Sequence, residues 1–231
     1  MATDHSNSSA STIRNERRDF PEWHRGRPTY ALWALQFDTD PLLPRMQSAQ
    51  EALADLLLPG YGRQPHVTLS LCGFPSAQPQ HDDDFGPTLV RAQLRALQQA
   101  GPAAFEIAIG GLDSFTSVPY FTVRDTAGQL QSLRNCLQQT PAIAAHGDYT
   151  PHVTIGLYAD VFPMHHVLQR LRAVALPADL HLPVTGVSLL SYEATHIGGP
   201  LQCVASYAFA NGLLQWHGAP WFPLDESLVL Q

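Results

Sequence analysis

The sequence contains no lysine, but it contains 13 arginines. A phosphate-binding loop of the Walker A type, a Schiff base and a lysine–nucleotide intermediate each need the primary amine of a lysine side chain. The absence of lysine therefore excludes an ATP-dependent ligase that works through a lysyl-adenylate.

Cysteine and long apolar runs are also scarce. The three cysteines, Cys72, Cys136 and Cys203, are widely separated, which argues against a disulfide framework and predicts a reducing, cytoplasmic location. No apolar run approaches the roughly 20 residues of a membrane-spanning helix, so no membrane association is expected. Residues 1–28 lack the apolar segment of a secretory signal and are expected to form a disordered or extended leader.

Charged residues make up only 14% of the chain, whereas hydrophobic residues make up 45%. The formal net charge is −7, and five of the arginines precede residue 28. A long nucleic acid normally requires a basic face on the folded part of a protein. The composition therefore favours a short RNA end or a small nucleotide as substrate, and no protein partner is evident. A length of 231 residues suits one large domain or two small lobes with a real core.

One short pattern occurs twice. The tetrapeptide Pro-His-Val-Thr stands at residues 65–68 and again at residues 151–154, each time in an apolar run of strand length. None of the other nine among the 11 histidines has a threonine two positions later. A single His-x-Thr is a weak motif and is usually an ordinary strand segment. Two copies in equivalent settings favour a shared chemical role.

The order of predicted elements also repeats. Apolar periodicity predicts strands at 29–37, 104–112, 118–125, 182–190 and 201–210, in addition to the two motif strands. It predicts helices near 42–57, 90–97, 130–137 and 167–174. The sequence thus indicates a duplicated domain over residues 29–210, with two lobes at about 29–113 and 114–210 related by a pseudo-twofold axis. Residues 211–231 are expected to form a tail that packs on this domain.

Alternation along the motif strands separates a polar face from an apolar one. His66, Thr68 and Ser70 are expected on one face of the first strand, with Val67, Leu69 and Leu71 on the other. The second copy repeats the pattern, with His152 and Thr154 opposite Val153, Ile155 and Leu157. If the lobes pack around a twofold axis, the two polar faces meet across a cleft.

Two histidines and two threonines suit phosphoryl chemistry without a metal or another cofactor. An imidazole with a pKa near 6.5 can accept or donate a proton near neutral pH. Threonine hydroxyls can donate hydrogen bonds to the non-bridging oxygens of a phosphodiester. One histidine can therefore activate the nucleophile while the other protonates the leaving oxygen.

With these motifs the chain resembles the 2H phosphoesterase superfamily, whose signature is two His-x-Thr/Ser-x motifs, one in each lobe. The matching segments are "HVTL" at His66–Leu69 and "HVTI" at His152–Ile155. The resemblance implies a bilobal α+β fold, with antiparallel sheets that line a central cleft and helices outside. It implies metal-independent hydrolysis of 2′,3′-cyclic phosphates or 2′–5′-linked RNA or nucleotides.

By the same resemblance, His66 and His152 would be the acid–base pair, and Thr68 and Thr154 would bind the phosphate. For a 2′,3′-cyclic substrate it favours His152 as base and His66 as acid, although the twofold symmetry leaves this assignment open. The bacterial RNA 2′,3′-cyclic phosphodiesterase branch often has phenylalanine and arginine five residues after the respective histidines. Leucine stands at both positions here, so the substrate of that branch does not follow.

Other interpretations remain. A non-catalytic nucleotide-binding module could keep the same cleft, and a metal hydrolase could use His81, Asp82–Asp84 and the pair His165–His166. A solvated surface is the favoured interpretation of those last residues, because adjacent helical histidines point about 100° apart.

Four residues flank the motifs and could stack on a base or contact phosphate: Tyr61, Arg63, Tyr149 and Tyr158. Aromatic residues beside strands more often serve packing, and the roles of Arg63 and Tyr158 stay open between the two. Cys72 is expected on the same strand face as His66, as a buried structural thiol.

Overall fold

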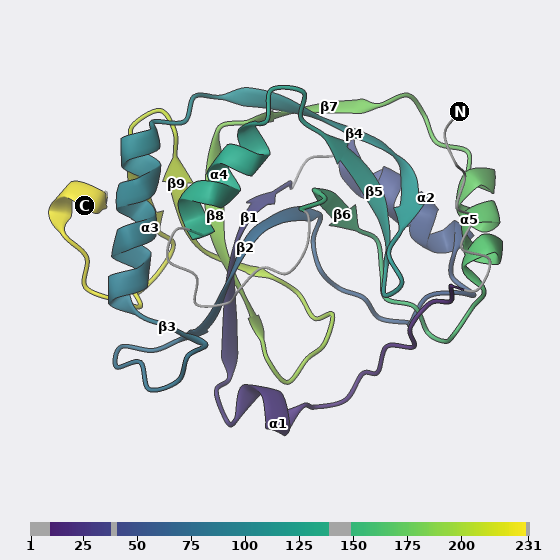
Figure 1. Cartoon of the computed structure of the whole chain (residues 1–231), viewed down its shortest axis with the longest axis horizontal. Helices are drawn as coiled ribbons and strands as arrows, with labels where there is room; N and C mark the ends of the chain where they lie inside the picture. The colour runs from purple at the N-terminus through teal and green to yellow at the C-terminus, as the bar shows by residue number, and fades with distance from the viewer. Residues whose placement is uncertain (1–9, 38–40, 139–148, 230–231) are drawn as a thin grey trace.

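The computed structural model describes residues 10–37, 41–138 and 149–229. Its strands form two sheets (Figure 1). The six-stranded sheet has the order β10 (Leu213–Trp216), β9 (Gln202–Ala208), β8 (Gly186–Glu193), β1 (Thr29–Gln36), β2 (His66–Pro75) and β3 (Asp84–Phe85). The four-stranded sheet has the order β6 (His152–Thr154), β5 (Pro119–Arg124), β4 (Phe105–Ser114) and β7 (Leu180–Val184). All neighbouring strands are antiparallel except β2 and β3.

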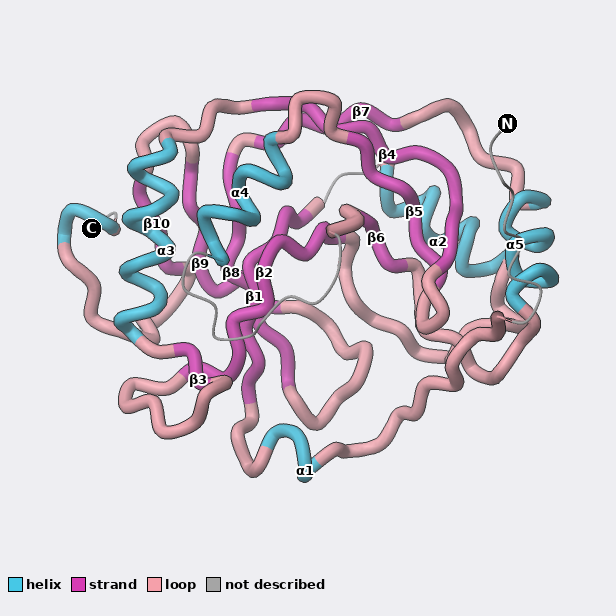
Figure 2. The backbone as a smooth tube through the Cα atoms, in the orientation of Figure 1, coloured by secondary structure: helices cyan, strands magenta, loops and turns pink. Residues whose placement is uncertain are grey.

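Helices cover the sheets from outside, as Figure 2 shows. The longer helices are α2 (Leu42–Ala52), α3 (Pro87–Ala100), α4 (Gln129–Gln138) and α5 (Met164–Ala173), and the short ones are α1 (Pro21–His24) and the 3-10 helix η1 (Glu226–Leu228). Apolar side chains of α3 and α4 share one core with the six-stranded sheet. The predicted α+β class with two antiparallel sheets is confirmed.

Most of the predicted helices and strands form where the apolar periodicity indicates them, and α3 illustrates why. The helix begins with a proline, which is favourable there because a backbone N–H in the first turn would have no partner within the helix. Val90, Leu94 and Leu97 lie on one buried stripe. Gly101 ends the helix in a left-handed conformation with φ of 55°.

Two helices contact the sheet to which their neighbouring strands do not belong. Helix α2 follows β1, yet its Arg45 donates a hydrogen bond to the carbonyl of Ile109 in β4 (3.1 Å). Helix α4 follows β5, yet its Arg134 donates to the carbonyl of Leu69 in β2 (2.7 Å). This exchange interlocks the two halves of the molecule.

The strand predicted at 182–190 is wrong as a single element. The chain leaves the four-stranded sheet after Val184 and enters the six-stranded sheet at Gly186. A side chain at Gly186 would collide with the carbonyl of Tyr207, so glycine permits the close approach at the crossing. Both strands have the same alternating pattern, and sequence periodicity therefore does not reveal the break.

Strand pairing also crosses the division that the sequence suggests near residues 113 and 114. Strand β4, from the first half, pairs with β5 and β7, and strand β8, from the second half, pairs with β1. The sheets are therefore not made from two contiguous stretches of chain, and the residue boundaries of the lobes stay a prediction.

The described part of the leader, residues 10–28, forms a strap along one side of both sheets (Figure 1). At one end Thr12 is buried and its hydroxyl donates to the carbonyl of Asp160 (2.8 Å). At the other end Arg27 pairs with Asp83 (2.6 Å) and Asp84 (2.8 Å). The strap is thus extended and anchored at both ends.

The C-terminal tail continues the six-stranded sheet as β10, which pairs with β9. Phe222 is buried and meets Phe85 edge-on, with ring centroids 6.0 Å apart.

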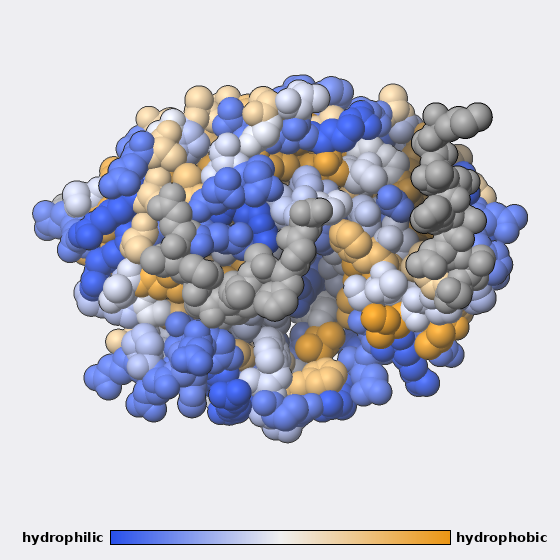
Figure 3. Space-filling view, in the orientation of Figure 1, coloured by the Kyte–Doolittle hydropathy of each residue, from blue (hydrophilic) through white to orange (hydrophobic). Residues whose placement is uncertain are grey.

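On the face in Figure 3, hydrophilic side chains dominate over α3, and apolar ones gather near the segment before α5. In the described ranges no helix has the length and apolar character needed to cross a membrane.

Candidate active site

The two motif strands lie side by side where the sheets meet (Figure 1). Strand β2 pairs with β1 in the six-stranded sheet, and β6 is the edge strand of the four-stranded sheet next to β5. The fold therefore brings His66 and His152 to one junction, although they come from different sheets.

Burial follows the predicted alternation close to the histidines. Val67 and Val153 are fully buried in the common core, and Thr68 and Thr154 are only half-buried. Cross-strand pairing places Thr68 opposite Ala34 and Thr154 opposite Tyr120. Each threonine thus shares a strand face with its histidine.

The alternation fails further along β2. Leu71 was expected on the buried face but is 46% exposed, whereas Cys72 lies in the core with Val67 and Leu69. The register to β1 shifts at two points, on either side of the pairs that Ser70 and Leu71 make. Each β-bulge adds one residue and reverses which side chains point inward. Cys72 is therefore a buried thiol, as expected, but it does not share the face of His66.

Both imidazoles are anchored in the same way. The Nδ1 atom of His66 lies 2.8 Å from the carbonyl oxygen of Gln64, and that of His152 lies 2.8 Å from the carbonyl oxygen of Thr150. A carbonyl can only accept, so each Nδ1 carries the hydrogen. The neutral tautomer then leaves the lone pair on Nε2. The intervening proline keeps the preceding residue extended in both copies.

The surroundings of the two histidines differ. His66 is only 6% exposed, and this burial lowers its pKa to about 4. The nearby positive charges of Arg63 and protonated His152 lower it further, while the Gln64 carbonyl opposes the shift. His152 is half-buried, and burial also lowers its pKa. Its ring meets Phe115 edge-on at 5.0 Å.

Hydrogen bonds tie the segment before the second motif to the first motif strand. The hydroxyl of Tyr149 donates to the carbonyl of Thr68 (3.0 Å), and Arg134 donates to the next carbonyl, that of Leu69. The guanidinium of Arg134 also lies 4.4 Å from the centre of the Tyr149 ring. These contacts set the position of β2 relative to the chain that enters β6.

The structure separates the roles of the other residues near the motifs. Tyr158 is 1% exposed, and its hydroxyl lies 2.6 Å from that of Ser114, which is a packing role. Tyr61 is partly buried against the core, and burial raises its pKa to about 12. The Arg63 guanidinium lies 4.2 Å from the centre of the Tyr192 ring. Its positive charge also lowers the pKa of His66. Sequence reasoning named Arg63 but had no signal that assigned it to the site.

The residues considered for a metal hydrolase do not come together. Asp83 and Asp84 bind Arg27, near β3, whereas His165 and His166 lie on α5 at the other end of the molecule (Figure 1). In the ranges that the structure describes, no group of three or more histidine, cysteine or acidic side chains could hold a metal ion.

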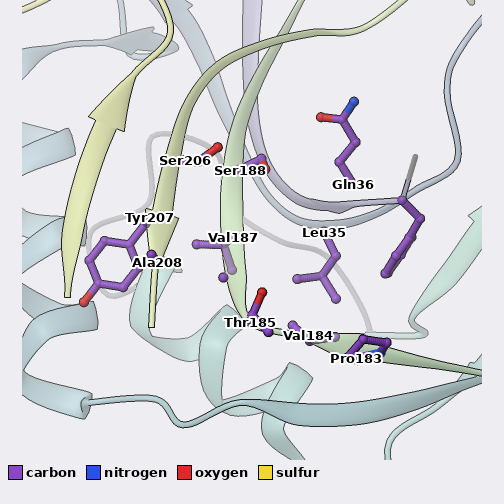
Figure 4. A pocket seen from close by; sticks show the side chains of 12 residues that line it. Leu35, Gln36, Pro183, Val184, Thr185, Val187, Ser188, Ser206, Tyr207 and Ala208 are labelled. Atoms are coloured by element: carbon purple, nitrogen blue, oxygen red, sulfur yellow. The ribbon is translucent and has the colours of Figure 1, made fainter. Parts of the chain in front are cut away.

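Two cavities are formed by the six-stranded sheet and its connections, and neither has His66 or His152 in its wall. One, of about 250 Å³, forms where β7 gives way to β8, with Ser188 and Ser206 close together in Figure 4. Its wall includes Gln36, the cross-strand neighbour of His66. A larger one, of about 660 Å³, lies between the strap and the loop after β8, and Gly62 and Tyr192 contribute to its wall. Both cavities are lined by segments that lie far apart in the sequence, so no local motif predicts them.

The fold and the twin motifs define an interlocked α+β protein with a paired-histidine junction. Residues 38–196 match the profile of the 2′-5′ RNA ligase superfamily. Because this match spans more than half of the chain, the protein belongs to that superfamily, as the two His-x-Thr motifs indicated.

The chain is similar to several solved structures. The structure of Escherichia coli LigT complexed with 3′-AMP superposes with a TM-score of 0.50 at 15% identity, covering 78% of this chain and 98% of LigT. The protein TT0787 of Thermus thermophilus is also similar, at 15% identity and a TM-score of 0.46, with coverage of 78% of this chain and 97% of that one. No curated protein matches the chain in sequence.

Proposed function

We propose that this protein is a metal-independent phosphodiesterase that hydrolyses 2′,3′-cyclic phosphates or 2′–5′ linkages of RNA or nucleotides. The observation that carries the proposal is the identical anchoring of the two motif imidazoles. Each Nδ1–H is bound to a backbone carbonyl, so each Nε2 is left for proton transfer. Two such nitrogens at one junction match the need for a base on one side of phosphorus and an acid on the other.

The reaction then proceeds by one displacement. The Nε2 atom of the base takes a proton from water, and the water oxygen forms a bond to phosphorus. The bond from phosphorus to the 2′ or 3′ oxygen breaks, and the acid gives its proton to that oxygen. Thr68 and Thr154 donate hydrogen bonds to the non-bridging oxygens, where negative charge accumulates. Exchange of protons with solvent restores the two histidines.

Burial favours His66 as the base and His152 as the acid, the reverse of the assignment that family resemblance favours. His66 is the more enclosed imidazole, and the charge of Arg63 further disfavours its protonated form. At neutral pH it is therefore neutral and can accept a proton. His152 is half-buried, so its protonated form is less strongly disfavoured. A bound phosphate raises the pKa of both imidazoles through its negative charge.

A small substrate agrees with the acidic net charge of −7 and with the nucleotide that the similar fold of LigT holds, 3′-AMP. Cyclic mononucleotides, 2′–5′ oligoadenylate and RNA with a cyclic phosphate end are the three substrate types to compare.

The test measures turnover of these substrates in EDTA by the wild type, His66→Ala, His152→Ala and the double variant. We expect each single variant to lose most activity and the double variant to lose little more, because the pair acts as a unit. His181→Ala, an exposed histidine on β7, is the control and should retain activity. Wild-type turnover in either motif variant contradicts the two-histidine mechanism, and nucleotide binding without any wild-type turnover favours a binding module instead.

A further inference from the structure

The candidate site lacks a permanent positive charge if it consists only of two imidazoles and two hydroxyls. Both histidines have pKa values below the ordinary one, so they are mostly neutral in the free protein at pH 7. A phosphodiester is an anion, and its transition state gathers further negative charge on the non-bridging oxygens. An arginine remains charged at every relevant pH and presents a planar fork that matches phosphate oxygens.

Arg63 lies at the right place to supply this charge. It stands three residues before His66, in the segment that leads directly into β2. Its guanidinium carbon is 4.2 Å from the centre of the Tyr192 ring. Its positive charge acts on the His66 imidazole, which is why it contributes to the lowered pKa of that histidine.

The backbone on both sides of Arg63 is fixed to the loop after β8. The amide of Gly62 donates to the carbonyl of Gly198 (2.8 Å). The Gln64 side chain accepts from the amide of Leu201 (2.8 Å) and donates to its carbonyl (3.1 Å). The Tyr192 ring under the guanidinium packs against Tyr30, with centroids 5.5 Å apart. An arginine held in this way loses little conformational freedom when it binds an anion.

Arg63 also has an unused hydrogen-bond donor. Its Nε is the only buried side-chain nitrogen or oxygen without a hydrogen-bond partner in the described part of the chain. A buried donor without an acceptor is energetically unfavourable, and a bound anion would supply the acceptor. No carboxylate neutralises Arg63 within the same described ranges, a property that it shares with every arginine except five: Arg18, Arg27, Arg95, Arg124 and Arg170. The larger cavity has Gly62 and Tyr192, the residues next to Arg63, in its wall.

We propose that Arg63 is a phosphate-binding residue of the candidate site, where its guanidinium binds the non-bridging oxygens of the substrate through Nε and a terminal nitrogen. This inference rests on the proposed function, since it assigns a further contact to the same reacting phosphate. It identifies the ligand class as a phosphate or phosphodiester anion.

The experiment measures the affinity of the intact protein for inorganic phosphate by calorimetry, which needs no turnover. Arg63→Gln keeps the approximate length of the side chain and removes its charge. We expect its dissociation constant for phosphate to rise by about 10-fold to 100-fold, as for loss of a charge-assisted hydrogen-bonded pair. Arg63→Lys should fall between this variant and the wild type, because it keeps the charge without the fork. Arg18→Gln, a change in an exposed ion pair, is the matched control and should bind like the wild type.

A packing role is separated from a phosphate-binding role by two further readouts. The pKa of His66, followed by NMR, should rise in Arg63→Gln because a neighbouring positive charge is gone. The kcat/KM for a cyclic nucleotide should fall with the phosphate affinity. Phosphate affinity within about twofold of the wild type in folded Arg63→Gln, or no phosphate binding by the wild type, overturns the proposal. If Arg63→Gln does not fold, wild-type phosphate affinity in Arg63→Lys overturns it, because the fork is then not used.

Failure of the proposed function gives a different result. A wild type that hydrolyses none of the three substrate types removes the phosphodiesterase assignment. The phosphate titration of the Arg63 variants still decides whether Arg63 binds the anion.

Discussion

At the scale of single residues, the difference between His66 and His152 has a consequence for stability. The ordinary histidine pKa of 6.5 applies to the unfolded chain, whereas burial holds His66 near 4 in the folded protein. Between these values the unfolded state binds a proton that the folded state does not. The contribution of a neutral, buried His66 to the free energy of unfolding is therefore complete above pH 6.5. It is lost as the pH falls toward 4.

We expect the free energy of unfolding to decrease by up to about 3 kcal/mol through this group as the pH falls from 7 to 4. Urea unfolding of the wild type and His66→Gln at several pH values measures the effect. The variant should show a shallower pH dependence, and His181→Gln, an exposed control, should follow the wild type. Parallel curves for His66→Gln and the wild type would show that His66 has an ordinary pKa.

The threonines provide a second prediction at this scale. Thr68→Ala or Thr154→Ala should leave the fold intact and lower kcat by about 10²–10³-fold, the usual effect of losing one oxyanion donor. Thr→Ser at either position should be much milder, because the hydroxyl remains. Steady-state kinetics of the four variants decides the matter, and equal damage from serine and alanine would assign the effect to the methyl group.

At the scale of elements, two hydrogen bonds outside the sheets help to hold β2 in position next to β6. The Tyr149 hydroxyl and the Arg134 guanidinium bind consecutive carbonyls of β2. Since Tyr149 stands three residues before His152, its bond connects the two motifs through a short piece of chain. A small displacement of one strand therefore changes the distance between the two imidazoles.

Tyr149→Phe should cost about 1 kcal/mol of stability, the usual net value of one hydrogen bond. It should also lower kcat/KM, because β2 is no longer held against the chain that enters β6. Tyr158→Phe is the matched control: it removes a buried hydroxyl that binds Ser114 rather than β2. Chemical denaturation and kinetics of both variants should show similar losses of stability but reduced activity only in Tyr149→Phe.

At the scale of the whole molecule, the two sheets cannot separate without breaking the contacts of the exchanged helices α2 and α4. The chain passes from the six-stranded sheet to the four-stranded sheet after β3 and returns after β7. The strap adds a connection along the outside. Its Arg27 lies over the Phe74 ring at 3.6 Å and pairs with two aspartates, of which Asp84 has a side chain only 4% exposed.

Arg27→Met should therefore destabilise the protein by about 3 kcal/mol, because it leaves a buried carboxylate without its partner. The bond from Arg27 lowers the pKa of Asp83, so this contribution is present above the ordinary aspartate value and is lost as the pH falls below it. The variant should lose less stability than the wild type on acidification. Arg18→Met, which breaks exposed ion pairs with Glu16 and Glu22, should change stability much less than Arg27→Met. Equal effects of the two variants would show that the strap anchor is no stronger than a surface ion pair.

The sequence by itself determined the positions of most helices and strands and the shared face of each His/Thr pair. Period-two alternation is a local property, and it holds at Val67 and Val153 because both pack directly into the core. The duplicated tetrapeptide likewise determined that two similar histidines occur in two similar strands, since the pattern can be counted without any knowledge of contacts.

Only the tertiary structure decided which side chains surround those histidines. The bulges of β2 place Leu71 outside and Cys72 inside, and they arise from pairing with β1, which lies far away in the sequence. The break between β7 and β8 depends on a close approach of Gly186 to β9. The buried Nε of Arg63, which has no hydrogen-bond partner, and the Tyr192 ring beneath its guanidinium are likewise products of the fold. Such properties depend on long-range contacts, and periodicity and composition do not encode them in any short stretch of chain.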